Sequence, residues 1–258
     1  MNYVDIAQAR TMPGLRLVLS PGGPGPWSEA AKSICYIKKL SFVPVAQDVG
    51  GPNPELQQWT AQTSAPVAAW NDERPRSTWI DQLYLFERLA PEPRLIPESL
   101  EDRVLMFGYS NEICGESGLG WSRRMMMFAR RARKAESGGK GPGLMDSMAE
   151  KYGYRPEVAQ AAPARVAQII GALAQCLDHQ RASGSRFFIG NQLSALDIYW
   201  AAFSGMCAPL PAEICPMSPG LRKMYSDIGP LVEAALSPLL LEHRDFVYRE
   251  FLQLPLDF

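Results

Sequence analysis

The sequence predicts an α/β + all-α protein: a small α/β domain (βαβ, then ββα) followed by a helical bundle domain. The chain has 258 residues, a length that suits two domains. Short apolar strands alternate with helical patterns up to residue 92, whereas beyond Pro97 the strand signals end and long helical patterns begin. The proline-rich segment 93–97 is therefore the expected linker between domains at 1–92 and 98–258.

The first half of the α/β domain is predicted to be a strand, a helix and a second strand. Leu15–Leu19 is short and apolar, which indicates a strand. Pro26 suits the first position of a helix, and apolar residues continue at helical spacing to about Leu40. A second strand is expected over Val43–Val49. This order implies a parallel pair joined by a right-handed crossover.

The second half of this domain is predicted to hold two more strands and a helix. A short helix is expected over Pro54–Thr60 and a third strand over Val67–Trp70. After a turn, a fourth short strand is expected over Arg74–Arg76, and a helix then runs from Ser77 through Leu89.

The second domain shows helical patterns without strands. The glycine-rich segment Ser137–Gly143 is expected to form a mobile loop between two of the predicted helices. The expected helices are Glu98–Cys114, Trp121–Ala135, Pro163–Ala182, Ala195–Met206 and Pro238–Leu252.

The composition narrows the classes of function. Hydrophobic residues make up 47% of the chain, which allows a sizeable core, and the formal net charge of -1 gives no electrostatic footprint for nucleic acid or an anionic membrane. No apolar run approaches the roughly 20 residues that span a bilayer. The basic run from Arg123 to Lys134 is either a solvated helix face or an anion-attracting wall over a site.

The number and spacing of the cysteines and histidines favour a protein of a reducing compartment that has no metal site. The five cysteines are odd in number and form no C-x-x-C pair, and the chain has only two histidines. A disulfide framework is therefore not expected. Since the N-terminus also lacks a basic segment followed by an apolar one, we expect a cytoplasmic protein.

Three motifs carry a family resemblance. Thr63-Ser64-Ala65-Pro66-Val67 enters the third strand, where Pro66 on its own is read as a trans edge-strand proline. Arg76-Ser77 precedes a helix, where Ser77 on its own is read as an N-cap. The segment 190–198, G-N-Q-L-S-A-L-D-I, has Ser194 and Asp197 at the spacing of a capping box.

In order and spacing these motifs resemble the cytosolic glutathione S-transferase superfamily. The resemblance implies a thioredoxin-like N-terminal domain, glutathione as co-substrate, no metal, and a detoxifying homodimer. It implies that Ala65 and a cis Pro66 bind the cysteinyl part of glutathione, and that Ser77 at a helix N-terminus holds the γ-glutamyl carboxylate. Arg76 stands where the family usually has an acidic residue. Either Arg76 pairs with a carboxylate of glutathione, or the γ-glutamyl amino group is bound in a different way from that usual in the family.

The loop from Ser20 to Ser28 holds the candidates for activating the glutathione thiol. Family members with a catalytic cysteine carry it directly before a Pro-aromatic pair, but Gly25 precedes Pro26-Trp27 here, which disfavours that mechanism. Trp27 is expected beside glutathione. Either hydroxyl, Ser20 or Ser28, is a candidate donor to the thiolate, and backbone N–H groups of the glycine-rich loop are the alternative.

The resemblance places a second, apolar substrate between the two domains. The expected reaction is conjugation of the glutathione thiolate to a small hydrophobic electrophile. The alternatives are a glutathione-dependent lyase, isomerase or dehalogenase, and a non-catalytic scaffold that binds glutathione or another ligand. The candidate wall residues of this pocket are Tyr109, Trp121, Arg123 and Arg124.

Overall fold

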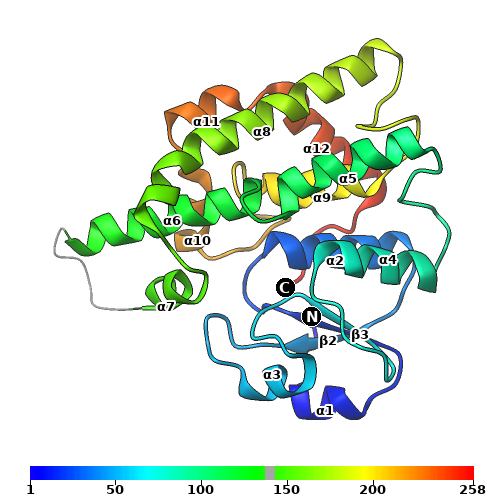
Figure 1. The fold of residues 1–258 in the computed structure, drawn as a ribbon, viewed down its shortest axis with the longest axis vertical. Helices are drawn as coiled ribbons and strands as arrows, with labels where there is room; N and C mark the ends of the chain where they lie inside the picture. Colours follow the sequence, from blue (N-terminus) through cyan, green and yellow to red (C-terminus); the bar gives the residue numbers. More distant parts are fainter. Residues whose placement is uncertain (137–142) are drawn as a thin grey trace.

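The computed structural model describes residues 1–136 and 143–258, and it contains the predicted two-domain arrangement (Figure 1). The predicted mobile loop falls almost entirely on residues 137–142, which lie outside the described residues. Within the described ranges, no helix is long and apolar enough to cross a membrane.

A three-stranded sheet forms the centre of the first domain. Strand β1 (Leu15–Leu19) lies between β2 (Val43–Ala46) and β3 (Val67–Trp70). As predicted, β1 and β2 run parallel, and β3 pairs antiparallel to β1, with Val18 opposite Val67. The second strand ends at Ala46 rather than Val49. The predicted fourth strand is reduced to one antiparallel bridge between Ala68 and Arg76.

Helices cover both faces of the sheet. α2 (Pro26–Ile37) and α4 (Trp79–Leu89) lie between the sheet and the helical domain, whereas α1 (Ile6–Thr11) and α3 (Pro54–Thr60) lie on the far side (Figure 1). The sheet can pack against helices on both of its faces because successive side chains of β1 point to opposite sides. Leu17 packs in the larger core with α2 and α4, and Val18 packs with the residues of α1 and α3.

Several predicted helix boundaries were wrong. α4 begins at Trp79, and its N-cap is Thr78 rather than Ser77, because the Thr78 side chain accepts a hydrogen bond from the N–H of Asp81. The helix expected from Pro163 begins at Pro156, and Pro163 lies inside it. α1 and three short helices of the second domain were not predicted.

The helical domain is built around α9 (Ala195–Ser204), in which every residue is buried. Figure 1 shows α9 lying across the middle of this domain. The long helices around it are α5 (Leu100–Cys114), α6 (Leu119–Glu136), α8 (Pro156–Ala182) and α12 (Pro238–Phe251). The short ones are α7 (Leu144–Lys151), α10 (Pro219–Ser226) and α11 (Pro230–Ala235).

Asp197 positions α9, as the capping-box motif suggested. Its carboxylate accepts hydrogen bonds from the backbone N–H of Ser194 at 2.8 Å and of Phe188 at 3.0 Å. The Ser194 hydroxyl lies 2.8 Å from the same carboxylate, and Nε2 of the fully buried His243 lies 2.9 Å from it. One side chain thereby ties the preceding loop, α9 and α12 together.

Replacing Asp197 with Ala is expected to lower the free energy of unfolding by about 3–5 kcal/mol, because His243 and two amides lose their buried acceptor. Asp178→Ala, which removes an exposed carboxylate of α8, is the matched control and should change stability by less than about 0.5 kcal/mol. Urea denaturation followed by circular dichroism measures both. Equal midpoints for the two variants would contradict the role given to Asp197.

Candidate functional site

A cavity of about 400 Å³ lies between the two domains. The first domain contributes the loop from Ser20 to Pro26, the first turn of α2, and Ala65. The second domain contributes residues of α6, α7 and α10. Its described lining residues include no acid, and Arg124 is the one charged residue among them.

Methionine forms much of the wall on the helical side. Its unbranched, polarizable side chain suits a pocket that accommodates apolar ligands of varied shape. Phe128, Leu144 and Leu221 add further apolar surface. The lining methionines are Met127, Met145, Met148, Met206 and Met224.

Helix α7 ties the two domains together beside this cavity. Lys151 Nζ donates to the carbonyl of Gly51 at 3.1 Å and also to that of Thr63. The Tyr152 hydroxyl lies 3.1 Å from the Ser64 hydroxyl. Since Tyr152 and the start of α7 line the cavity, these contacts fix the position of one wall relative to the first domain.

Ala65 lines the cavity. The Ala65–Pro66 peptide bond is cis, as the resemblance implied. Within the described chain, no hydrogen bond engages the N–H of Ala65, which is only partly exposed. A half-buried amide without a partner is costly unless a ligand or water satisfies it. The main chain at Ala65 is therefore suited to bind the backbone of an extended peptide-like ligand.

Ser20 lines the cavity, and a hydrogen-bond network orients its hydroxyl. Gln47 Nε2 donates to Ser20 Oγ at 2.8 Å. The orientation of Gln47 is set by the buried Asn53, whose Nδ2 donates to Gln47 Oε1 at 3.1 Å and whose Oδ1 accepts the N–H of Asp48 at 2.8 Å. Because Ser20 Oγ accepts from Gln47, its own proton is available to a group in the cavity.

Gln47 and Asn53 were missed by sequence reasoning. Gln47 follows β2 directly, and Ser20 follows β1. The carboxyl ends of parallel strands meet at one sheet edge, which is where open α/β sheets bind ligands. That rule could have paired the two residues, whereas no local motif marks Asn53.

Ser28 and Trp27 lie in the first turn of α2 and also line the cavity. Ser28 is buried, and helix α2 directs its N-terminal end, with the partial positive charge of unpaired N–H groups, at the same space. Trp27 Nε1 donates to the carbonyl of Cys114 at 3.0 Å, and its ring packs edge-on against Phe203 at 4.8 Å between centroids.

The four predicted wall residues have different positions. Arg124 lines the cavity, and Trp121 lies behind it, with its ring centroid 4.8 Å from the Arg124 guanidinium carbon. Arg123 is not a lining residue; it is fully buried and donates to the carbonyls of Met206 and Tyr225 at 3.0 and 3.2 Å. Tyr109 is not a cavity residue. It lies beside Cys176 of α8, and burial raises its pKa.

The residues predicted to bind the γ-glutamyl carboxylate do not line this cavity. Arg76 Nη2 pairs with Glu73 Oε2 at 3.2 Å, so its charge is already partly compensated. Ser77 is exposed, and it borders a small adjoining space of about 20 Å³ together with Pro66 and Trp27. Trp27 is the lining residue that this small space shares with the interdomain cavity.

Tyr225 is a cavity hydroxyl that sequence reasoning missed. It comes from α10, a helix that was not predicted. Burial raises the pKa of Tyr225 to about 12, so the phenol stays protonated near neutral pH. Its hydroxyl lies 3.5 Å from the carbonyl of Pro24, at the outer limit of a hydrogen bond.

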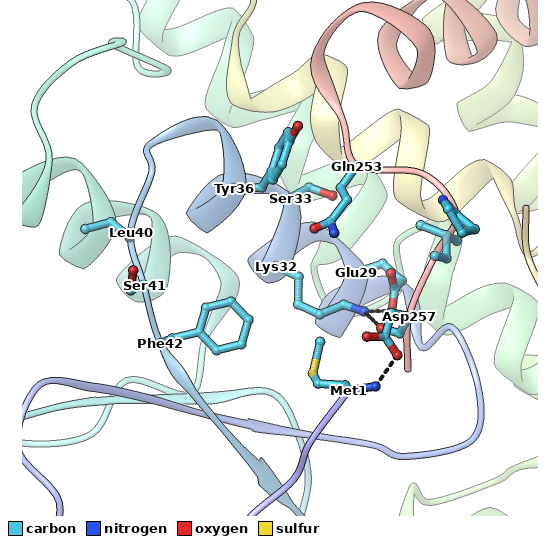
Figure 2. A pocket seen from close by; sticks show the side chains of 12 residues that line it. Met1, Glu29, Lys32, Ser33, Tyr36, Leu40, Ser41, Phe42, Gln253 and Asp257 are labelled. Atoms are coloured by element: carbon cyan, nitrogen blue, oxygen red, sulfur yellow. Dashed lines mark hydrogen bonds and ion pairs between the residues drawn. The ribbon is translucent and has the colours of Figure 1, made fainter.

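A second cavity, of about 380 Å³, lies between α2 and the two ends of the chain (Figure 2). Its charged groups pair with one another. Lys32 Nζ lies 2.8 Å from Glu29 Oε1 and 2.5 Å from the backbone oxygen of Asp257, and the Asp257 carboxylate pairs with the amino group of Met1. These ion pairs compensate the charged groups that line this cavity.

The cysteines are poor nucleophiles. All five are free, and burial raises the pKa of each thiol, most strongly for Cys35 and Cys114. None of them lines the interdomain cavity. Among the described residues, no group of histidine, cysteine, aspartate and glutamate side chains is arranged to hold a metal ion.

Comparison with solved structures shows that the chain has the glutathione S-transferase fold. A glutathione S-transferase domain-containing protein from Marinobacter aquaeolei VT8 matches with a TM-score of 0.61 and 16% identity, over 91% of this chain and 98% of that one. A glutathione S-transferase from Methylobacillus flagellatus KT with glutathione bound matches with a TM-score of 0.60 and 14% identity, over 92% and 96%.

The beta-etherase LigF from Sphingobium sp. strain SYK-6 also matches, with a TM-score of 0.56 and 16% identity, over 90% of this chain and 99% of that one. No protein-family model matches the sequence, and no curated protein matches it significantly. The similarity therefore lies in the fold, and the predicted fold class is confirmed.

Gly120, at the start of α6, allows Trp27 to approach the helical domain. A Cβ atom there would lie 2.7 Å from Trp27 Cη2 and 2.5 Å from Phe203 Cε1. We expect Gly120→Ala to destabilise the protein by about 1–3 kcal/mol despite the better helix propensity of alanine. Thermal unfolding together with tryptophan fluorescence checks this.

The matched control is Gly171→Ala inside α8, where an added Cβ would meet nothing within 4 Å. This change should leave stability unaltered or raise it by up to about 1 kcal/mol. If both alanines are tolerated equally, close packing at Gly120 does not set the position of Trp27.

Proposed function

We propose that this protein is a glutathione transferase, which joins the glutathione thiolate to an apolar electrophilic small molecule in the interdomain cavity. One observation carries the proposal: Ser20, the first turn of α2 and Ala65 line a single cavity. The fold, and the glutathione found in one similar solved structure, support it.

In the proposed complex the cysteinyl main chain of glutathione pairs with Ala65 on the sheet side of the cavity. Its thiol then lies near Ser20 and the first turn of α2. Hydrogen bonding to the thiolate and the positive end of the helix dipole both favour the charged form, which lowers the thiol pKa. The γ-glutamyl part would extend past Trp27 and Pro66 toward Ser77, where Arg76 replaces the usual acid.

We assign the thiolate donor to Ser20 rather than Ser28. The network from Asn53 through Gln47 leaves the Ser20 proton free for the cavity. A thiolate held there attacks the electrophilic carbon of the second substrate, so that a C–S bond forms while the leaving group departs with its electron pair. Holding the two reactants side by side supplies much of the rate. The five free cysteines support a reducing, cytoplasmic setting.

Ser20→Ala is expected to raise the pKa of enzyme-bound glutathione by about 1–2, because the thiolate loses one charge-assisted hydrogen bond. Activity should therefore fall at mildly acidic pH and recover above the new pKa. Ultraviolet absorbance of the bound thiolate against pH measures the shift directly. Ser28→Ala should not produce it; a shift with Ser28→Ala alone would move the assignment to Ser28.

Glutathione binding itself tests the broader proposal. Isothermal titration calorimetry should give saturable binding of glutathione at or below millimolar concentration, and an aryl halide should then be conjugated. Absence of binding would rule out every glutathione-dependent activity. Binding without conjugation of several electrophile types would favour the non-catalytic scaffold.

We further propose a homodimer formed through α4 and α5. These helices expose a group of large apolar side chains, in which the Tyr84 ring stacks on Phe107 at 5.6 Å between centroids. Contiguous apolar surface of this kind marks an interaction site on a protein surface. The other members of the group are Leu100, Val104 and Leu105, which are 75%, 63% and 48% exposed.

The double variant Leu100→Asp with Val104→Asp is expected to be monomeric, because two carboxylates cannot be buried without partners at the interface. Size-exclusion chromatography with light scattering measures the mass. Leu231→Asp, at a residue 52% exposed on α11, is the control and should leave the dimer intact. A dimer that survives the double variant uses another surface.

A further inference from the structure

Arg124 lies in the wall of the interdomain cavity without an acidic partner. Its guanidinium carbon is 4.1 Å from the ring centroid of Tyr152 and 4.6 Å from that of Trp27. Within the described residues, no carboxylate forms an ion pair with it and no acceptor takes a hydrogen bond from it. The rings stabilise the positive charge but do not satisfy its N–H donors as oxygen acceptors would.

Neighbouring cations on the same helix are compensated inside the protein. Arg123 donates to two backbone carbonyls, Arg130 pairs with Asp227, and Arg131 pairs with Asp146 at 2.8 Å. Arg124 therefore differs from these residues in facing the cavity with its charge unmatched.

The surroundings of Arg124 make an unmatched charge costly. Burial lowers the pKa of the Arg124 guanidinium, and burial of the nearby Tyr225 raises the pKa of its phenol to about 12. A buried cation is favourable when a counter-charge completes its hydrogen bonds. Since the described lining contains no acid, the missing counter-charge has to come from a ligand.

We propose that Arg124 binds the carboxylate of the second substrate, whose apolar body packs on the methionine wall. This inference rests on the proposed function, because it names the class of electrophile that the transferase accepts. Arg124 belongs to α6, on the helical side of the cavity, whereas Ala65 and Ser20 belong to the sheet domain. The carboxylate at Arg124 is therefore assigned to the second substrate and not to glutathione.

Binding of an unreactive ligand pair tests the inference without glutathione. Cinnamate and cinnamamide share an apolar body and differ in charge. We expect calorimetry to show that the protein binds cinnamate about tenfold to a hundredfold more tightly than cinnamamide, because a charge-assisted hydrogen bond is lost with the amide. Arg124→Gln should abolish this preference, and Arg124→Lys should retain part of it, since lysine keeps the charge but loses the fork geometry.

Arg130→Gln is the matched control, because it removes a cation of the same helix whose charge Asp227 already compensates. It should leave the cinnamate preference unchanged. Circular dichroism and unfolding curves confirm that each variant folds. Equal affinities for cinnamate and cinnamamide in the unaltered protein, or a preference that survives Arg124→Gln, would overturn the inference.

Conjugation then links the inference to the proposed function. The electrophile pair is para-chloro-meta-nitrobenzoate and its methyl ester; thiolate attack forms the C–S bond as the C–Cl bond breaks and chloride leaves with the electron pair. We expect kcat/KM for the benzoate to fall about tenfold to a hundredfold in Arg124→Gln, with the value for the ester unchanged.

The affinity for glutathione shows whether the carboxylate that Arg124 binds belongs to glutathione or to the second substrate. If it belongs to the second substrate, Arg124→Gln and the unaltered protein should bind glutathione with the same affinity. If the variant loses glutathione affinity instead, Arg124 binds glutathione, and the inference fails while the proposed function stands. If glutathione does not bind even the unaltered protein, the proposed function fails, and the cinnamate titration still decides whether Arg124 recognises a carboxylate.

Discussion

The hydrogen bond from Trp27 Nε1 to the carbonyl of Cys114 joins the first turn of α2 to the end of α5. The same indole packs against Phe203 of the central helix α9, and the Arg124 guanidinium lies over its ring. This close approach depends on Gly120, where any side chain would collide with the ring. The walls of the cavity come from both domains, so its shape depends on this aromatic contact together with the α7 contacts to Gly51, Thr63 and Ser64. A rigid indole suits the task because it combines a large apolar surface with one hydrogen-bond donor.

Much of the fold followed from hydrophobic periodicity. The bounds of β1, α3 and β3 were predicted as the structure has them, because each is a short apolar or amphipathic run ended by turn residues. The short helices α1, α7, α10 and α11 were missed, since fewer than three turns give little periodicity and their stability comes from tertiary packing. The start of α4 was wrongly predicted at Ser77, because the adjacent Thr78 can cap a helix equally well and is the residue that does so.

The site was predictable only where sequence motifs define the backbone. The loop from Ser20 to Ser28 was found from its position after a predicted strand, whereas the cis form of Pro66 was implied only by the family resemblance of the segment that enters the third strand. Gln47 reaches Ser20 through strand pairing, which no local pattern records. Arg123 and Arg124 could not be distinguished, because consecutive residues on a helix point about 100° apart and the sequence does not say which faces the cavity.

The two sides of the cavity have different chemistry, and this separates thiol activation from substrate choice. The lining from the sheet domain contains no charged side chain, so the proposed thiolate would be stabilised by the Ser20 hydroxyl and the N-terminus of α2. The helical side is apolar and contains one cation. In the proposed function, thiol activation depends on backbone geometry and on a hydroxyl oriented by Gln47 and Asn53, whereas selection among electrophiles depends on side chains of α6, α7 and α10. Because different elements carry the two tasks, substitutions on the helical side can change the accepted substrate while the thiol chemistry stays the same.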